Sequence, residues 1–141
     1  MKKKILCLDF DGVCHSYTSG WLGAAVITDP AVPGLFEFLE AVKDEFDIQV
    51  FSSRSRQEDG VEAMQEWFVA ERKLWRERGG KPPEDTPLTL SFPTEKPAAF
   101  VSIDDRALTF TGTWPSLETL KAFQPWNKPA YSKDRLVRFE S

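Results

Sequence analysis

The chain has 141 residues, of which 41% are hydrophobic and 28% are charged, a composition typical of one globular domain and not of a disordered protein. Its formal net charge of −4 disfavours a protein that binds nucleic acid or anionic lipid by general electrostatic attraction. Two cysteines are too few for a disulfide framework, and a single histidine gives no zinc-binding pattern. We therefore expect one cytoplasmic domain over residues 1–141, with no membrane partner.

The first expected element is a buried strand close to the amino end of the chain. Residues 5–8 form a continuous apolar run that is followed by acidic residues and a glycine, a pattern typical of a central strand in a parallel sheet. The next residues lack helical periodicity and are rich in Ser, Thr, Gly and aromatic side chains. We therefore expect a small ordered flap over about 14–28, with a short extended segment at 24–28.

Helices and strands then alternate along the chain. Apolar residues recur every three or four positions over 35–42 and predict a helix, and an apolar strand follows at 48–51. A long amphipathic helix begins near Val61 and ends at Gly79. The remaining expected elements are extended segments at 88–92 and 100–103, a short strand at about 108–111 and a helix that begins near Ser116. The sequence leaves open whether 88–92 is a regular outer strand of the sheet, because only seven residues separate Lys96 from Asp104. This alternation predicts an α/β fold.

Acidic and hydroxyl side chains directly follow three of the expected strands. They are Asp9, Asp11, Ser52, Ser53, Asp104 and Asp105. Because the carboxyl ends of parallel strands meet at one edge of a sheet, we expect these side chains to lie close together. Carboxylates that lie close together repel one another unless a cation binds them, and oxygen ligands suit Mg²⁺. With Lys96 ahead of the last of these strands, the set indicates phosphate chemistry.

Four short motifs in this set occur in a fixed order. They are LDFDGV at 8–13, VFS at 50–52, KP at 96–97 and VSIDD at 101–105. Together they resemble the four motifs of the haloacid dehalogenase-like hydrolase superfamily, and the chain is similar to small uncharacterised bacterial and phage members. The resemblance implies a three-layer, Rossmann-like parallel sheet with helices on both faces, a small flap after the first strand and no large cap domain.

The resemblance also implies a role for each acidic residue. Asp9 would be the nucleophile that attacks phosphorus and forms an aspartyl-phosphate. Asp11 would protonate the leaving oxygen as a general acid and then serve as the base for the attacking water. Mg²⁺ would be held by Asp9, Asp104 and the backbone carbonyl of Asp11, with Asp105 in a supporting role.

A second group of residues would bind the phosphate. The resemblance assigns this role to the side chains of Ser52 and Lys96 and to the loop residues Phe10, Gly12 and Ser53. Gly12 would also allow the chain to turn after the first strand. Each side-chain assignment has an alternative, because Ser52 is also a candidate helix N-cap and Lys96 a candidate surface residue.

Four residues near this edge of the sheet are candidate substrate contacts. His15, Tyr17 and Trp21 lie in the flap, where they would contact substrate or, as the alternative, pack the flap itself. Arg54 would bind a second phosphate through its guanidinium group or, as the alternative, remain a solvated surface residue. Cys14 is predicted to be an unreactive thiol.

The function we expect is a magnesium-dependent phosphomonoester hydrolase that acts on a small phosphorylated metabolite or nucleotide. One alternative is a polynucleotide 3′-end phosphatase, for which basic residues of the tail at about 125–141 would supply a local binding strip in spite of the negative net charge. These basic residues are Lys128, Lys133, Arg135 and Arg138. A second alternative is a non-catalytic phosphate-binding or receiver-like domain. The sequence predicts no oligomeric state.

Overall fold

A computed structural model of the protein describes residues 2–83 and 86–126. The chain divides into two compact units, with the boundary between Ile103 and Asp104. The first unit contains β1 (Lys4–Leu8), α1 (Leu35–Val42), β2 (Phe46–Val50), the 3₁₀ helix η1 (Ser53–Arg56), α2 (Gly60–Glu77) and β3 (Val101–Ile103), and the second contains α3 (Leu117–Lys121). Most of the expected tail, with its basic residues, lies outside the described residues.

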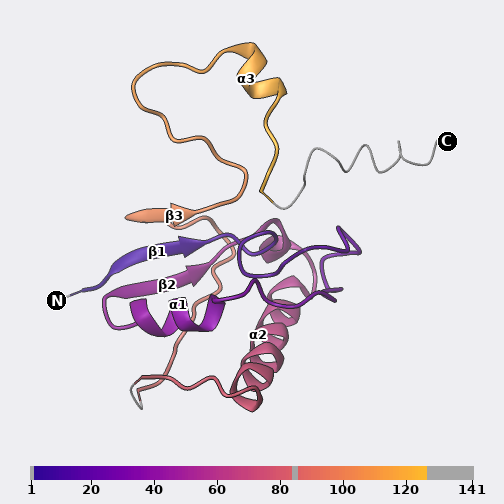
Figure 1. Ribbon diagram of the computed structural model, residues 1–141, viewed down its shortest axis with the longest axis vertical. Coiled ribbons are helices and arrows are strands. Elements are labelled where there is room, and N and C mark those ends of the chain that lie inside the picture. Colours follow the sequence, from indigo (N-terminus) through magenta and orange to yellow (C-terminus); the bar gives the residue numbers. More distant parts are fainter. Residues whose placement is uncertain (1, 84–85, 127–141) are drawn as a thin grey trace. The chain divides into compact units, whose positions relative to one another are not determined.

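The first unit is built on a three-stranded parallel sheet with the strand order β2-β1-β3 (Figure 1). Leu6 of the central strand β1 lies opposite Ile48 of β2 and Val101 of β3. The consecutive residues Leu6, Cys7 and Leu8 are all buried, so both faces of β1 are covered at this end, which explains why its sequence is apolar without alternation. The mixed α/β class, the parallel sheet and the central position of the first strand are therefore confirmed.

The hydrophobic core combines apolar side chains from the sheet and from both long helices. Leu6 and Leu8 lie opposite Ile48 and Val50, so these four side chains share one face of the sheet. They belong to one buried cluster with Phe10, Cys14, Leu35, Phe36, Leu39, Met64, Trp67 and Phe68. The cluster fixes the loop after β1, because Phe10 and Cys14 are fully buried in it.

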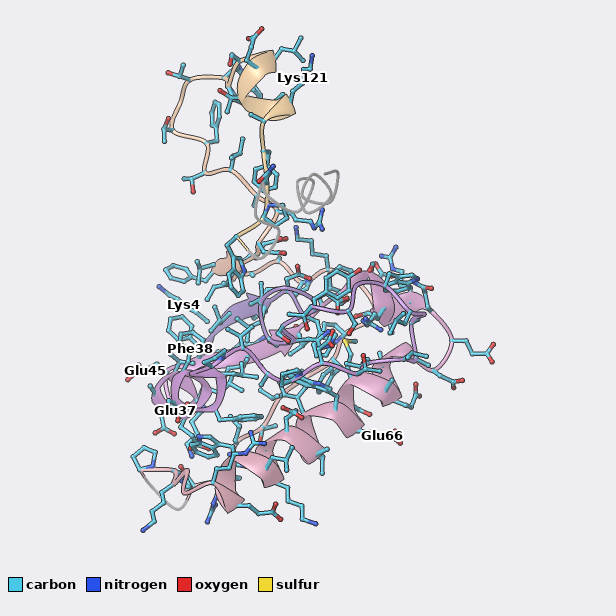
Figure 2. The ribbon with its side chains drawn as sticks, turned by 45° about the vertical axis from the view of Figure 1, so that its right-hand side comes forward. Lys4, Glu37, Phe38, Glu45, Glu66 and Lys121 are labelled. Carbon is cyan, nitrogen blue, oxygen red and sulfur yellow. The ribbon has the colours of Figure 1, made fainter. Side chains whose placement is uncertain are left out.

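The helix α2 is amphipathic, as its sequence predicted. Met64, Trp67 and Phe68 are buried in the core, whereas Glu66 is exposed and lies on the side of α2 that points away from the sheet (Figure 2). None of the helices among the described residues combines the length and the apolar character that a membrane span requires.

The extended segment at 88–92 is not a regular strand of the sheet. One residue of this segment, Ser91, pairs with the outer edge of β2: its N–H donates to Ile48 O at 3.0 Å and its carbonyl oxygen accepts from Val50 N–H at 2.8 Å. Leu88, Leu90 and Phe92 pack against the core. Prolines at both ends of the segment, which carry no N–H, explain why pairing stops after one bridge.

Two further expected extended segments carry no strand. Residues 108–111 of the second unit include exposed apolar side chains and have no strand partner among the described residues. Residues 24–28 are turn and loop, so the flap contains no regular element there. In both segments the β-favouring composition lacks a neighbouring strand, and composition alone does not form a sheet.

Candidate active site

The loop after β1 is a tight turn around the carbonyl oxygen of Phe10. The backbone N–H groups of Val13, Cys14 and His15 all donate to this oxygen, at 3.2, 2.9 and 2.9 Å. Gly12 has a φ of 83°, a conformation that strongly favours glycine, and its N–H donates to His15 O at 2.8 Å. The predicted turn at Gly12 is therefore confirmed, and the turn directs the side chains of both motif aspartates.

Two contacts orient the half-buried Asp9. Its Oδ1 accepts from Phe10 N–H at 2.9 Å, and its carbonyl oxygen lies 3.5 Å from the Sγ of Cys14, which donates to it. The Phe10 and Gly12 N–H groups are thus both used within the loop, and their predicted contact with a phosphate stays a prediction. Burial raises the pKa of the Cys14 thiol, and the negative charges of Asp9 and Asp11 raise it further. This supports the prediction that Cys14 is unreactive.

Three carboxylates gather where β1 and β3 end. The N–H of Asp9 donates to Ile103 O at 3.0 Å, and Asp104 and Asp105 directly follow that residue. One carboxylate oxygen from each of Asp9, Asp104 and Asp105 lies within 4.8 Å of the other two. We call these three residues the acid cluster. It contains two of the three predicted magnesium ligands and the predicted supporting residue Asp105.

The donor set of the acid cluster fits a hard divalent cation. Asp104 Oδ1 accepts from Arg106 N–H at 2.8 Å, and Asp105 Oδ1 is buried without a hydrogen-bond partner among the described residues. A buried carboxylate oxygen without a partner is costly, and a cation would satisfy it. Carboxylate oxygens are ligands that Mg²⁺ prefers, so the acid cluster is a candidate site for this ion.

The carboxylate of Asp11 lies in a different environment. Arg54 binds it through two nitrogens, with Nε 2.9 Å from Oδ2 and Nη2 3.0 Å from Oδ1, and His15 Nδ1 lies 2.9 Å from Oδ1. Burial by itself raises the pKa of Asp11, but the hydrogen bonds from His15 and Arg54 and the charge of Arg54 outweigh it, so the pKa lies below its ordinary value of 3.8. Asp11 is therefore held as a carboxylate.

His15 connects Asp11 to the end of the flap. Its Nε2 accepts from Asp29 N–H at 3.1 Å, so Nδ1 carries the proton that is donated to Asp11. Asp29 in turn accepts from the N–H and hydroxyl of Ser19, at 2.7 and 2.6 Å. His15 is 1% exposed and stacks on Phe10, so it packs the flap, the alternative role that the sequence left open.

Arg54 is fully buried, so the interpretation as a solvated surface residue is wrong. Its Nη1 donates to the carbonyl oxygens of Gly23 and Ala24, both at 2.9 Å, and the Trp21 ring centroid lies 4.7 Å from its guanidinium carbon. With the other nitrogens on Asp11, this arrangement does not support contact between Arg54 and a second phosphate. We call Asp11, His15, Asp29 and Arg54 the Asp11 network.

The remaining predicted site residues have mixed surroundings. Ser52 is the N-cap of η1, the alternative role considered above: its Oγ accepts from Arg54 N–H at 3.2 Å, and its own N–H donates to Ser55 Oγ at 3.0 Å. Ser53 and Lys96 are exposed, and Lys96 lies outside any helix or strand. Phosphate binding by these residues stays a prediction.

Of the two other flap aromatics, Tyr17 is half-buried with its ring centroid 5.9 Å from that of His15, whereas Trp21 is 45% exposed. Of the two, Trp21 therefore has the larger surface available to a substrate. The sequence analysis missed two contacts of the site. Asp29 is a partner of His15, for which the sequence carries no motif, and Arg54 is the partner of Asp11. The position of Arg54 just after a strand, near the strand that leads to Asp11, was the available signal.

In comparisons with known proteins, no family model, no curated protein and no solved structure matches this chain. The superfamily resemblance therefore stays a prediction that rests on the four motifs. The geometry described here can do two things chemically: bind a cation through the acid cluster, and hold one oriented carboxylate in its ionised form through the Asp11 network.

Proposed function

We propose that the protein is a magnesium-dependent phosphomonoester hydrolase that forms an aspartyl-phosphate on Asp9. The observation that carries this proposal is the acid cluster, in which oxygens of Asp9, Asp104 and Asp105 lie within 4.8 Å of one another. The parallel sheet with its acidic strand ends supports the finer proposal of a three-layer, Rossmann-like core with helices on both faces.

Asp9, Asp104 and Asp105 would hold Mg²⁺ through their side chains, and Asp11 through its backbone carbonyl. The bound ion would neutralise negative charge on the phosphate and so favour the approach of the negatively charged Asp9 carboxylate. The N–H of Phe10 donates to Asp9 Oδ1 and so orients the carboxylate that would attack phosphorus.

The reaction proceeds in two displacements. In the first, an Asp9 oxygen attacks phosphorus, and the alkoxide or phenolate leaves with the electrons of the broken P–O bond and takes a proton from solvent water. In the second, water attacks the aspartyl-phosphate, its proton passes to a base, and phosphate leaves. Two steps of this kind regenerate the Asp9 carboxylate.

Asp11 is the base of the second displacement. Because its pKa lies below the ordinary value, its carboxylate is ionised at neutral pH, which is the form that a base requires, while the lowered pKa makes it a weak base. The same property makes Asp11 a poor proton donor for the first displacement. The proposal therefore expects faster turnover of aryl phosphates, whose phenolate leaves readily, than of alkyl phosphates.

The substrate class we propose is a small phosphorylated metabolite or nucleotide. Asp104 and Lys96 are both exposed, which supports a site that is open to substrate. Release of inorganic phosphate from a nucleotide, a sugar phosphate, an aryl phosphate and a 3′-phosphorylated oligonucleotide tests the proposal. We expect turnover with Mg²⁺, none with excess chelator, and inhibition by Ca²⁺, whose higher coordination number draws both oxygens of a carboxylate into ligation.

Each other outcome of this screen has a defined meaning. A strong preference for the oligonucleotide would favour the polynucleotide end phosphatase. Phosphate binding without release from any substrate would favour a non-catalytic domain. Turnover that is unaffected by chelator would contradict the proposal that the acid cluster binds the required metal.

A further inference from the structure

Arg54 connects its own segment to two others that are distant from it in the sequence. Its backbone belongs to η1, where Ser52 caps it. Through Nε and Nη2 it donates to the Asp11 carboxylate in the loop after β1. Through Nη1 it donates to two carbonyl oxygens of the flap, those of Gly23 and Ala24.

The burial of Arg54 makes these contacts depend on one another. The side chain is 0% exposed, and a buried guanidinium is tolerated only where its charge and its donors are matched. Asp11 supplies the opposite charge, while the flap carbonyls accept the remaining hydrogen bonds and the Trp21 ring lies over the cation. If the flap carbonyls are lost, some of the buried guanidinium N–H groups have no acceptor. If the Asp11 carboxylate is lost, the buried positive charge has no counter-charge.

The shape of the guanidinium fits this double contact. Its nitrogens form a planar fork that donates in two directions at once, whereas a lysine ammonium is a compact point charge at a single place. The Gly23 carbonyl oxygen also accepts from Val26 N–H at 3.1 Å, so the contact reaches the turn at the tip of the flap.

We propose that Arg54 is a positioning residue that couples the flap at 14–28 to the Asp11 carboxylate, so that an ordered flap and the working orientation of Asp11 form together. The catalytic part of this inference rests on the proposed function. The coupling itself is a property of the folded chain and is measurable without substrate.

Amide hydrogen exchange on the full chain, followed by mass spectrometry of peptides from the flap, tests the coupling. The proteins compared are wild type, Asp11→Asn, Arg54→Lys and the double variant. We expect each single substitution to speed exchange in the flap by about tenfold or more, and the double variant to exchange no faster than the faster single variant. Peptides from α2 report whether the core remains folded.

Arg72→Lys is the matched control. Arg72 also pairs with a carboxylate, at 2.9 Å from Glu40 Oε2, but it contacts neither the flap nor Asp11 in the described structure. Its substitution should leave exchange in the flap unchanged. Flap exchange in Asp11→Asn that equals wild type, or single effects that multiply in the double variant, would overturn the proposal.

The design distinguishes folding failure and loss of function from failure of the coupling. If Arg54→Lys does not fold, Asp11→Asn alone decides, because it leaves Arg54 and all flap residues in place. For the catalytic part, Arg54→Lys should lower kcat for an aryl phosphate about as much as Asp11→Asn does, with KM little changed, and a fall in kcat for Arg72→Lys of the same size would overturn it. If wild type shows no phosphatase turnover, or if its turnover does not depend on Asp9, the proposed function is contradicted. The hydrogen-exchange result would still decide whether Arg54 couples the flap to Asp11.

Discussion

Asp11 and Asp104 follow neighbouring strands of one parallel sheet, yet their carboxylates differ in what neutralises them. Asp11 is bound by the guanidinium of Arg54 and by His15, and its side chain is 14% exposed. Asp104 is exposed, makes no ion pair among the described residues and lies within reach of Asp9 and Asp105. Within residues 2–83 and 86–126, the protein supplies a positive charge for the first carboxylate and none for the second.

This difference separates two tasks at one edge of the sheet. A carboxylate that the chain neutralises has a fixed orientation and is ionised before the reaction begins, and a base needs both properties. Carboxylates that repel one another have an unmet need for positive charge, which suits a metal site. The predictions below test this division, beginning with the acid cluster and ending with the thiol that lies between the two regions.

Asp9→Asn should reduce phosphatase turnover by about 10³-fold or more, because an amide is a poor nucleophile and a weak ligand for magnesium. The measurement is steady-state phosphate release with Mg²⁺, and the thermal melting curve of the variant should resemble that of wild type. Asp44→Asn, a change at an exposed residue, is the control and should keep full activity. Activity of Asp9→Asn within tenfold of wild type would exclude Asp9 as the nucleophile.

Asp11→Asn should slow turnover by about 10²-fold, the usual contribution of a positioned base. Because the base acts in the second displacement, an aryl phosphate should still release one equivalent of phenol per enzyme in a fast burst before slow turnover. Rapid-quench kinetics measure the burst. A variant that loses the burst together with the steady state would show that Asp11 acts before the aspartyl-phosphate forms.

The sequence predicted regular elements well where local pattern and burial agree. The apolar run of β1, the helical periodicity of α1 and α2 and the strand-end acids were all readable, because each follows from a period or from a buried position. Whether 88–92 forms a regular strand could not be predicted, because pairing depends on a partner edge and on the prolines that bracket the segment. Only one bridge forms there.

The burial of Arg54 could not be predicted from the sequence for a related reason. An Arg between two serines is typical of a solvated turn, and its burial depends on the flap carbonyls and on Asp11, which are distant in the sequence. The N-cap role of Ser52, in contrast, is local and was among the alternatives that the sequence offered. Long-range polar contacts of this kind need the folded structure to become visible.

Glu40 is a second carboxylate that the chain itself neutralises, through Lys43 at 2.6 Å and Arg72 at 2.9 Å. Burial raises its pKa, but hydrogen bonds and charges of these two partners outweigh burial, so the pKa lies below its ordinary value of 4.5. A carboxyl whose pKa is lower in the native protein than in the unfolded chain stabilises the fold at any pH above its unfolded-state pKa. This stabilisation is lost as the pH falls through its native-state pKa.

Glu40→Gln should therefore lower the free energy of unfolding at pH 7 by about 2 kcal/mol, because the buried Lys43 and the partly exposed Arg72 both lose a charged partner. The difference from wild type should narrow as the pH falls below 4.5, the ordinary pKa of this carboxyl. Urea unfolding between neutral and acidic pH measures both quantities. A difference that stays constant over this range would show that Glu40 carries no charge-dependent stability.

Cys14 lies close to both Asp9 of the acid cluster and Asp11 of the Asp11 network. Burial raises the pKa of its thiol most, and the negative charges of these two aspartates raise it further. In the native protein its thiol should react with a disulfide reagent at least about tenfold more slowly than in the unfolded chain. This difference in reaction rate is the smallest effect we predict. It is measured in the Cys7→Ser variant, in which Cys14 carries the one remaining thiol. Rapid native labelling of Cys14 would contradict the burial of the loop after β1.

The most direct test of the acid cluster is metal binding to the protein without substrate. Titration with Mn²⁺, followed by electron paramagnetic resonance and by competition with Mg²⁺, counts the ions and measures their affinity. We predict one saturable site per chain, with affinity lowered at least about tenfold by Asp9→Asn and by Asp104→Asn and unchanged by Asp44→Asn. No saturable binding, or binding that is as tight in Asp104→Asn as in wild type, would contradict the account.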